Sequence, residues 1–132
     1  MPPAPAATSN APTPSSGERT RLPLGRLFGA RSGDKGGHAN LGVWARSEAA
    51  FAFLREMLTV EKLRELLPET ARLTVTRHEF PHLLAVNFLI EDILGQGVSA
   101  SSRFDPQAKA LGEWLRSRTI DVPSDLVRSE LH

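Results

Sequence analysis

A short segment of this sequence, Arg31 to Asn40, holds most of the side chains that could do chemistry. It reads RSGDKGGHAN, so a hydroxyl, an acid, a base, an imidazole and an amide lie close together beside three glycines. Glycine lets the backbone adopt positive φ and approach a ligand, and successive N–H groups in such a turn can hold an anion. The segment therefore predicts either a tight turn or a site for an anionic ligand.

Each polar residue of the segment suits a particular role in such a site. Asp34 could act as a general acid or base, and Lys35 could supply a point charge for a phosphate or carboxylate. Ser32 and Asn40 could form hydrogen bonds to the same ligand. Composition alone favours the turn, because Asp-Lys-Gly-Gly at residues 34–37 is also good turn chemistry, and Asp34 could make only a local turn contact.

Several familiar site classes do not fit the sequence. The segment lacks the spacing of a phosphate-binding P-loop, and Ser32 does not lie in a nucleophile elbow. The chain has no cysteine, which excludes disulfides, thiolate metal sites and cysteine nucleophiles. Its histidines show no metal-ligand spacing. We therefore expect no metal site and no cofactor.

Alternating apolar residues predict strands on both sides of the segment. Residues 26–32 and 39–47 predict two strands, joined by a hairpin connection of about seven residues, which is longer than usual. Further strands are expected in residues 71–80 and 84–91. Trp44 and Trp114 are expected to pack in the protein interior, as most aromatic side chains do.

Capping residues mark the starts of three expected helices. Ser47 and Thr59 can cap two helices before the third strand, and Asp105 with Pro106 can begin a last one. This order predicts an α+β fold, with helices packed on one face of a mostly antiparallel sheet of about four strands.

The strand at residues 84–91 is apolar on both faces apart from Asn87, so we expect it in the centre of the sheet. The face away from the helices would then expose apolar groups, which suggests a partner or a second copy of the chain. A buried Asn87 amide must be hydrogen-bonded. It could reach the Arg31–Asn40 segment or bond a neighbouring strand.

Composition limits the other function classes. The net charge is +1, from 16 basic and 15 acidic residues. The sequence therefore lacks the excess of positive charge that binding to nucleic acid or to an anionic membrane requires. No apolar run is long enough to span a membrane, and residues 1–20 do not resemble a secretory signal. Together with the absence of cysteine, this fits a cytoplasmic protein.

The chain divides into three parts by composition. Residues 1–20 are rich in Pro, Ala, Ser and Thr, and we expect a disordered tail there. Residues 21–123 should form the domain, and residues 124–132 a C-terminal tail.

Two blocks, Ala30–Arg46 and Glu79–Leu115, resemble the AtuA-like ferredoxin-fold domain. That domain occurs at the C-terminus of acyclic terpene utilisation AtuA family proteins and also as a separate small protein. The resemblance extends from Leu22 to Pro123. Its signature residues are Arg31-Ser32-Gly33-Asp34-Lys35-Gly36, then Asn40-x-Gly42-Val43, then Asn87-Phe88, then Gly95-x-Gly97-Val98-Ser99.

The resemblance implies a ferredoxin-like sandwich and strengthens the interpretation of the glycine-rich segment as a site. On this basis Asp34 and Lys35 are the catalytic candidates. The candidates for ligand binding are Arg31, Ser32, Gly33, Gly36, Asn40 and Asn87.

The family is associated with catabolism of acyclic terpenes and acyl-CoA-type intermediates. The resemblance therefore implies a small non-catalytic or co-catalytic subunit that docks on a large AtuA-type protein, with an acyl-CoA or a carboxylate as ligand. The alternative is a homo-oligomeric module that binds a small molecule without catalysis.

Overall fold

An antiparallel four-stranded sheet forms the body of the computed structural model, which describes residues 17–35, 37–91 and 110–131, with Lys35 described by its backbone alone. The strand order is β2-β3-β5-β4. The strands are β2 (Gly29–Lys35), β3 (His38–Trp44), β4 (Thr74–Phe80) and β5 (Ala85–Glu91). The expected α+β fold is confirmed, and so is the central position of β5.

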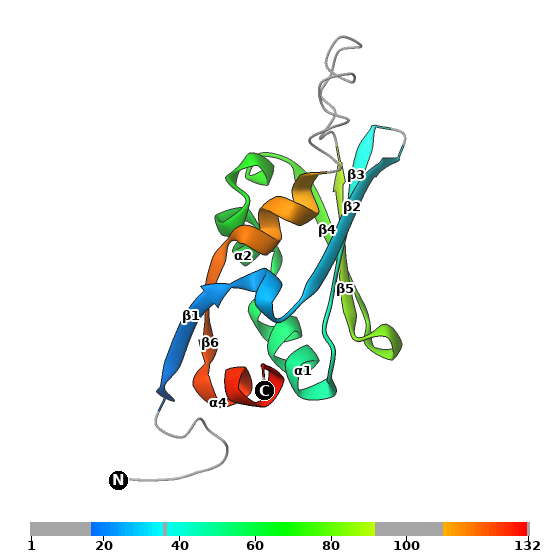
Figure 1. The fold of residues 1–132 in the computed structure, drawn as a ribbon. Coiled ribbons are helices and arrows are strands. Elements are labelled where there is room, and N and C mark those ends of the chain that lie inside the picture. Colours follow the sequence, from blue (N-terminus) through cyan, green and yellow to red (C-terminus); the bar gives the residue numbers. More distant parts are fainter. Residues whose placement is uncertain (1–16, 36, 92–109, 132) are drawn as a thin grey trace, which may run out of the picture.

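The helices lie on one side of this sheet (Figure 1). A second, two-stranded sheet pairs the first strand with the last, also on the helix side. The remaining elements are β1 (Arg19–Pro23), η3 (Leu24–Arg26), α1 (Glu48–Met57), α2 (Val60–Leu66), η4 (Pro68–Thr70), η5 (Pro81–Leu83), a helix over residues 110–117, β6 (Thr119–Pro123) and α4 (Ser124–Glu130).

The topology contains a split β-α-β unit, as in ferredoxin-like folds. The chain passes from β3 through α1 and α2 to β4, and β5 then inserts between β3 and β4. After the helix over residues 110–117, β6 pairs with β1 and not with the main sheet. The edge beside β3 is occupied by β2, which forms a hairpin with it.

The expected caps begin α1 and α2. The Ser47 hydroxyl accepts a hydrogen bond of 3.0 Å from the Ala50 amide, and Thr59 accepts one of 3.0 Å from Lys62. The Asp105 cap lies outside the described residues.

The two segments expected as tails contain ordered elements where they are described. Residues 124–130, in the expected C-terminal tail, form α4, and Ser47 donates a 2.7 Å hydrogen bond to the Glu130 carboxylate of that helix. Arg19 and Thr20, in the expected N-terminal tail, belong to β1, while residues 1–16 lie outside the described residues.

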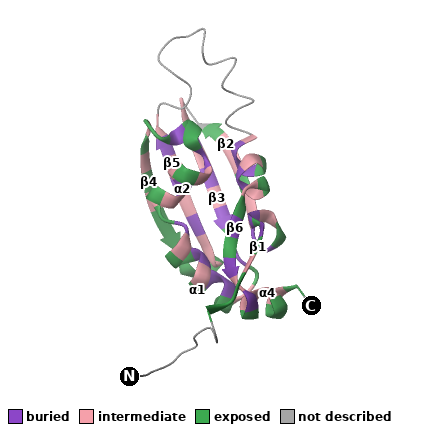
Figure 2. Cartoon of the chain, turned by 90° about the vertical axis from the view of Figure 1, so that its left-hand side faces the viewer, coloured by how far each residue is buried: buried purple, intermediate pink, exposed green. Residues whose placement is uncertain are grey.

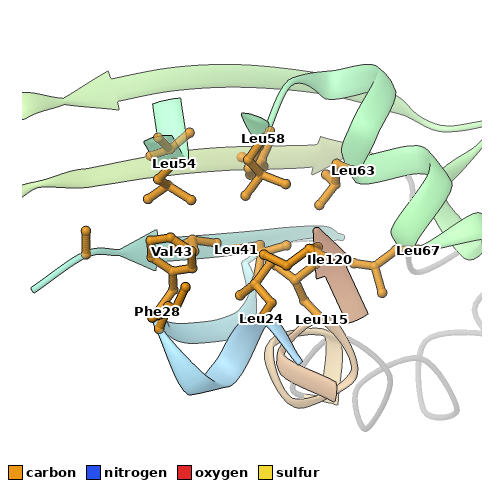
Figure 3. Close-up of a cluster of buried hydrophobic side chains, with 14 of the residues drawn as sticks. Leu24, Phe28, Leu41, Val43, Leu54, Leu58, Leu63, Leu67, Leu115 and Ile120 are labelled. Atoms are coloured by element: carbon orange, nitrogen blue, oxygen red, sulfur yellow. The ribbon is translucent and has the colours of Figure 1, made fainter. Parts of the chain in front are cut away.

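The core lies between the four-stranded sheet and the helices. Alternate residues of β3 and β5 point into it, and Figure 2 shows their buried stripes behind α1, β1 and β6. Leu115 is buried in the described helix, whereas Trp114 is half-buried. Figure 3 shows the meeting of sheet and helix side chains, including Leu41, Val43, Leu54, Leu58, Leu63 and Leu67.

The prediction of a seven-residue loop between the first two strands of the sheet is wrong. β2 continues to Lys35 and β3 begins at His38, with Gly33 paired to Asn40 and Asp34 paired to Ala39. Turn-forming residue types predicted a loop, but the cross-strand ladder overrides single-residue preferences. Gly37, with φ of +94°, provides the left-handed backbone that a tight hairpin turn favours.

Arg77 on β4 holds the C-terminal end of α1. Its guanidinium donates to the carbonyls of Leu58 at 2.9 Å and Arg55 at 2.7 Å, which have no partner within the helix. The Glu79 carboxylate accepts a 2.8 Å hydrogen bond from Arg77 and lies 3.4 Å from the Arg55 guanidinium.

This cluster predicts a pH dependence of stability. The hydrogen bond from Arg77 lowers the pKa of Glu79 below its usual 4.5, aided by the charges of Arg55 and Arg77 and opposed by partial desolvation. A carboxyl with a lowered folded pKa stabilises the protein above its unfolded pKa, and that contribution disappears as pH falls through the folded value. Urea denaturation at a series of pH values should show Glu79→Gln less stable than wild type at neutral pH. The difference should vanish in acid, and a constant difference would contradict the prediction.

Candidate functional site

The outer face of the four-stranded sheet, on the side away from the helices, carries the candidate site. Directly paired residues on neighbouring antiparallel strands point to the same face, so the register defines this surface. We call it the open face, and it consists of Gly29, Arg31 and Gly33 on β2, Asn40, Gly42 and Trp44 on β3, Ala85, Asn87 and Leu89 on β5, and Thr76, His78 and Phe80 on β4. In Figure 1 the labelled helices lie on the other side of the sheet, and the turn that contains η5 projects at its lower end.

A shallow depression of about 380 Å³ lies on the open face, over β2, β3 and β5. It is open to solvent and is formed by side chains and backbone of three neighbouring strands. Its lining residues are Arg31, Ser32, Gly33, Asn40, Gly42, Trp44 and Asn87.

Glycines form the floor of the depression. A Cβ at Gly42 would lie 3.4 Å from the Asn87 side-chain oxygen, so that amide leans over the Gly42 backbone. A Cβ at Gly29 would collide with the Trp44 ring at 2.3 Å, because the indole lies across Gly29. A Cβ at Gly33 would meet nothing within 4 Å. Both Gly33 and Gly42 leave space that a side chain would fill in an ordinary strand.

Three of the predicted ligand-binding side chains come together here. Arg31 pairs with Gly42, and Gly42 pairs with Asn87, so Arg31 and Asn87 lie on the strands on either side of a residue without a side chain. Asn40 lies on β3 beside them. Asn87 therefore lines the same depression as Arg31 and Asn40, and its side-chain oxygen lies nearest to Gly42.

Two other predicted site residues belong to the opposite face of β2. Ser32 pairs with the buried Leu41, and its hydroxyl accepts a 2.7 Å hydrogen bond from the Gly112 amide of the helix over residues 110–117. Asp34 pairs with the buried Ala39 and is exposed near the end of the strand. The structure thus separates Asp34 from Arg31, Asn40 and Asn87.

Some predicted site residues lie outside what the structure describes. These are the side chain of Lys35, Gly36 and the second glycine-rich block, Gly95 to Ser99.

Trp44 lines the candidate site, although the sequence analysis did not place it there. It was expected to pack in the interior, yet it is 40% exposed and forms one wall of the depression. A signal was present, because Trp44 falls on the same side of the strand alternation as Asn40 and Gly42, opposite the buried Leu41 and Val43. The sequence analysis gave more weight to the general tendency of tryptophan to be buried than to this alternation.

The depression offers positive charge and amide groups to a ligand. It contains one guanidinium and two carboxamides, and none of the described lining residues is acidic. Nowhere in residues 17–35, 37–91 and 110–131 do three or more His, Asp or Glu side chains gather as a metal site would require. The same residues include no helix long and apolar enough to cross a membrane.

Comparison with known proteins identifies the family. No curated protein and no solved structure matches the chain. The family described as the AtuA ferredoxin-like domain matches residues 22–121, from the end of β1 into β6. The chain belongs to the AtuA ferredoxin-like domain family.

Proposed function

We propose that this domain is a cytoplasmic small subunit that docks on a large AtuA-type protein through the open face. The complex would serve the catabolism of acyclic terpenes or of related acyl-CoA or carboxylate compounds, as membership of the family suggests. The observation that carries the proposal is a sheet with helices on one face and exposed aromatic side chains on the other.

The exposed apolar groups gather at the end of the sheet away from the β2–β3 turn. Trp44 pairs with Ala85, and Ala85 pairs with Phe80, so these three residues form a row across three strands. Trp44 is 40% exposed and Phe80 is 46% exposed, and Leu83 in the following η5 turn is 69% exposed. Aromatic residues gathered in this way are typical anchors of protein interfaces.

The position of Asp34 favours a non-catalytic subunit. A general acid or base must come within hydrogen-bond reach of its substrate. Asp34 lies on the helix side of β2, so it does not face a ligand held by Arg31 and Asn87 on the open face. In this proposal the chain supplies binding, and the large partner supplies the chemistry.

The test is the affinity of the purified chain for a large AtuA-type protein from the same organism. Trp44→Ala and Phe80→Ala should each weaken the complex at least about tenfold, as expected for aromatic anchors in an interface. Leu131→Ala is the matched control, because Leu131 is also an exposed apolar residue, at 36%, but follows α4. Titration calorimetry gives the affinities, and circular dichroism checks that each variant is folded.

Two results would overturn the proposal. One is the absence of any complex with the large protein. The other is a complex that Trp44→Ala and Phe80→Ala weaken no more than Leu131→Ala does. A homo-oligomer of the pure chain that dissociates on Trp44→Ala would support the alternative, a self-associating binding module.

A further inference from the structure

The polar groups of the depression are spaced to hold a small planar group between them. Neighbouring strands lie about 4.8 Å apart, so the backbones of Arg31 on β2 and Asn87 on β5 are about 10 Å apart on either side of Gly42, and the Asn87 side chain reaches toward Gly42. Because Gly42 has no side chain, a ligand group can enter the space between Arg31 and the Asn87 amide. Asn40, two residues along the same strand, is a further polar residue that lines the depression.

The charge of this set suits a monoanion. The Arg31 side chain is exposed, and its guanidinium forms no hydrogen bond or ion pair with another residue in the described part of the chain. A guanidinium matches a carboxylate with two parallel hydrogen bonds, and the amides of Asn40 and Asn87 can donate further ones. The backbone of β3 is paired on both sides, by β2 and by β5, and therefore offers no nest of free N–H groups for a phosphate.

The wall of the depression suits an apolar stem. The Trp44 indole lies across Gly29 and leaves 40% of its surface exposed beside the polar groups. An apolar chain attached to the carboxylate can bury surface against this ring, which favours it over a small hydrophilic acid.

Gly33 gives an independent indication of an approaching ligand. Glycine weakens a strand, and it is usually kept where the backbone needs positive φ or where something comes close. Gly33 has neither a positive φ nor a neighbour within 4 Å of the position of a Cβ. Nothing in the described fold therefore requires glycine at this position, and the open space leaves room for a ligand against the backbone of β2.

From these observations we propose that the depression binds a carboxylate on an apolar stem, with Arg31 as its charge partner. The inference deepens the proposed function, since it rests on the open face as a binding surface. The carboxylate has two sources: a free carboxylic acid, or an Asp or Glu side chain of the large partner inserted into the depression.

The first experiment tests a free acid on the full chain labelled with ¹⁵N. Hexanoate is titrated against its neutral isostere hexanamide, and the side-chain amide signals of Asn40 and Asn87 are followed by NMR. Hexanoate should shift both signals, and hexanamide should bind at least about tenfold more weakly, because it lacks the charge. Arg31→Gln should weaken hexanoate binding by a similar factor. Arg19→Gln removes an exposed arginine from β1 and should leave binding unchanged.

A second variant blocks the depression without touching its donors. Gly33→Val places a strand-favouring side chain where there is open space, so the variant should fold at least as stably as wild type. It should nevertheless abolish hexanoate binding. The affinities of the same variants for the large AtuA-type protein then identify the source of the carboxylate. Loss of that complex in Arg31→Gln, without hexanoate binding to the wild type, assigns the carboxylate to the partner.

The inference is overturned if hexanoate binds Arg31→Gln as well as it binds wild type. It is equally overturned if hexanoate fails to bind and if Arg31→Gln and Gly33→Val leave the affinity for the large AtuA-type protein unchanged. In the second case a partner complex that still depends on Trp44 leaves the proposed docking intact. Conversely, a further outcome is hexanoate binding that Arg31→Gln weakens while no complex with the large protein forms. That result would support the carboxylate site and refute the docking.

Discussion

Replacing Phe88 with alanine is expected to lower the free energy of unfolding by about 3–5 kcal/mol. Phe88 lies on the central strand β5, is completely buried, and pairs with Leu41 on β3. Removing its ring loses the transfer free energy of a large apolar group and leaves a cavity between the sheet and the helices. Because small domains are stable by only about 5–15 kcal/mol, this single change would remove much of the total.

The adjacent residue supplies the control for Phe88. Leu89 points to the open face and is only partly buried, so Leu89→Ala should cost less than about 1 kcal/mol. Urea denaturation of both variants, followed by circular dichroism, measures the difference. Similar losses from Phe88→Ala and Leu89→Ala would mean that both faces of β5 are covered, which contradicts the open face.

A second large effect is expected from Gly112→Val. A Cβ at Gly112 would lie 3.3 Å from the Arg31 Cα and 3.3 Å from the Ser32 nitrogen. These are backbone atoms of β2 and cannot move aside as a flexible side chain would. Valine should therefore push the helix over residues 110–117 away from the sheet and lower the free energy of unfolding by about 1–3 kcal/mol. Loss of the hydrogen bond from the Gly112 amide to the Ser32 hydroxyl adds to this effect.

Gly33→Val is the matched comparison for Gly112→Val, because the same substitution enters open space on the other face of β2. Thermal unfolding should rank the proteins with Gly33→Val at or above wild type and Gly112→Val clearly below it. The reverse order would show that the helix does not approach β2 as closely as described.

The parts of the fold that depend on local chemistry could be predicted from the sequence. Ser47 and Thr59 mark the starts of α1 and α2, since a cap acts within a few residues. The central position of β5 follows from its apolar residues on both faces. The alternation in β3 also placed Asn40, Gly42 and Trp44 on one face.

The features that the sequence analysis missed depend on distant residues. The length of the β2–β3 hairpin is set by cross-strand pairing, whereas the turn-forming residue types from Gly33 to Lys35 predict a loop. The short helix α4 contacts α1 through the hydrogen bond between Ser47 and Glu130, two residues far apart in the sequence. The separation of Asp34 from Arg31 follows from strand geometry, which becomes visible only once these residues are assigned to a strand.

The pairing of β1 with β6 has a consequence for how the domain is made. Arg19 lies opposite Pro123, and the hydroxyls of Thr20 and Ser124 are 2.7 Å apart although 104 residues separate them. During synthesis β1 leaves the ribosome before the other described strands, and its partner strand β6 leaves after all of them. The domain therefore cannot complete its fold cotranslationally until β6 is free of the exit tunnel, and a nascent chain stalled before residue 119 keeps β1 unpaired and open to chaperones.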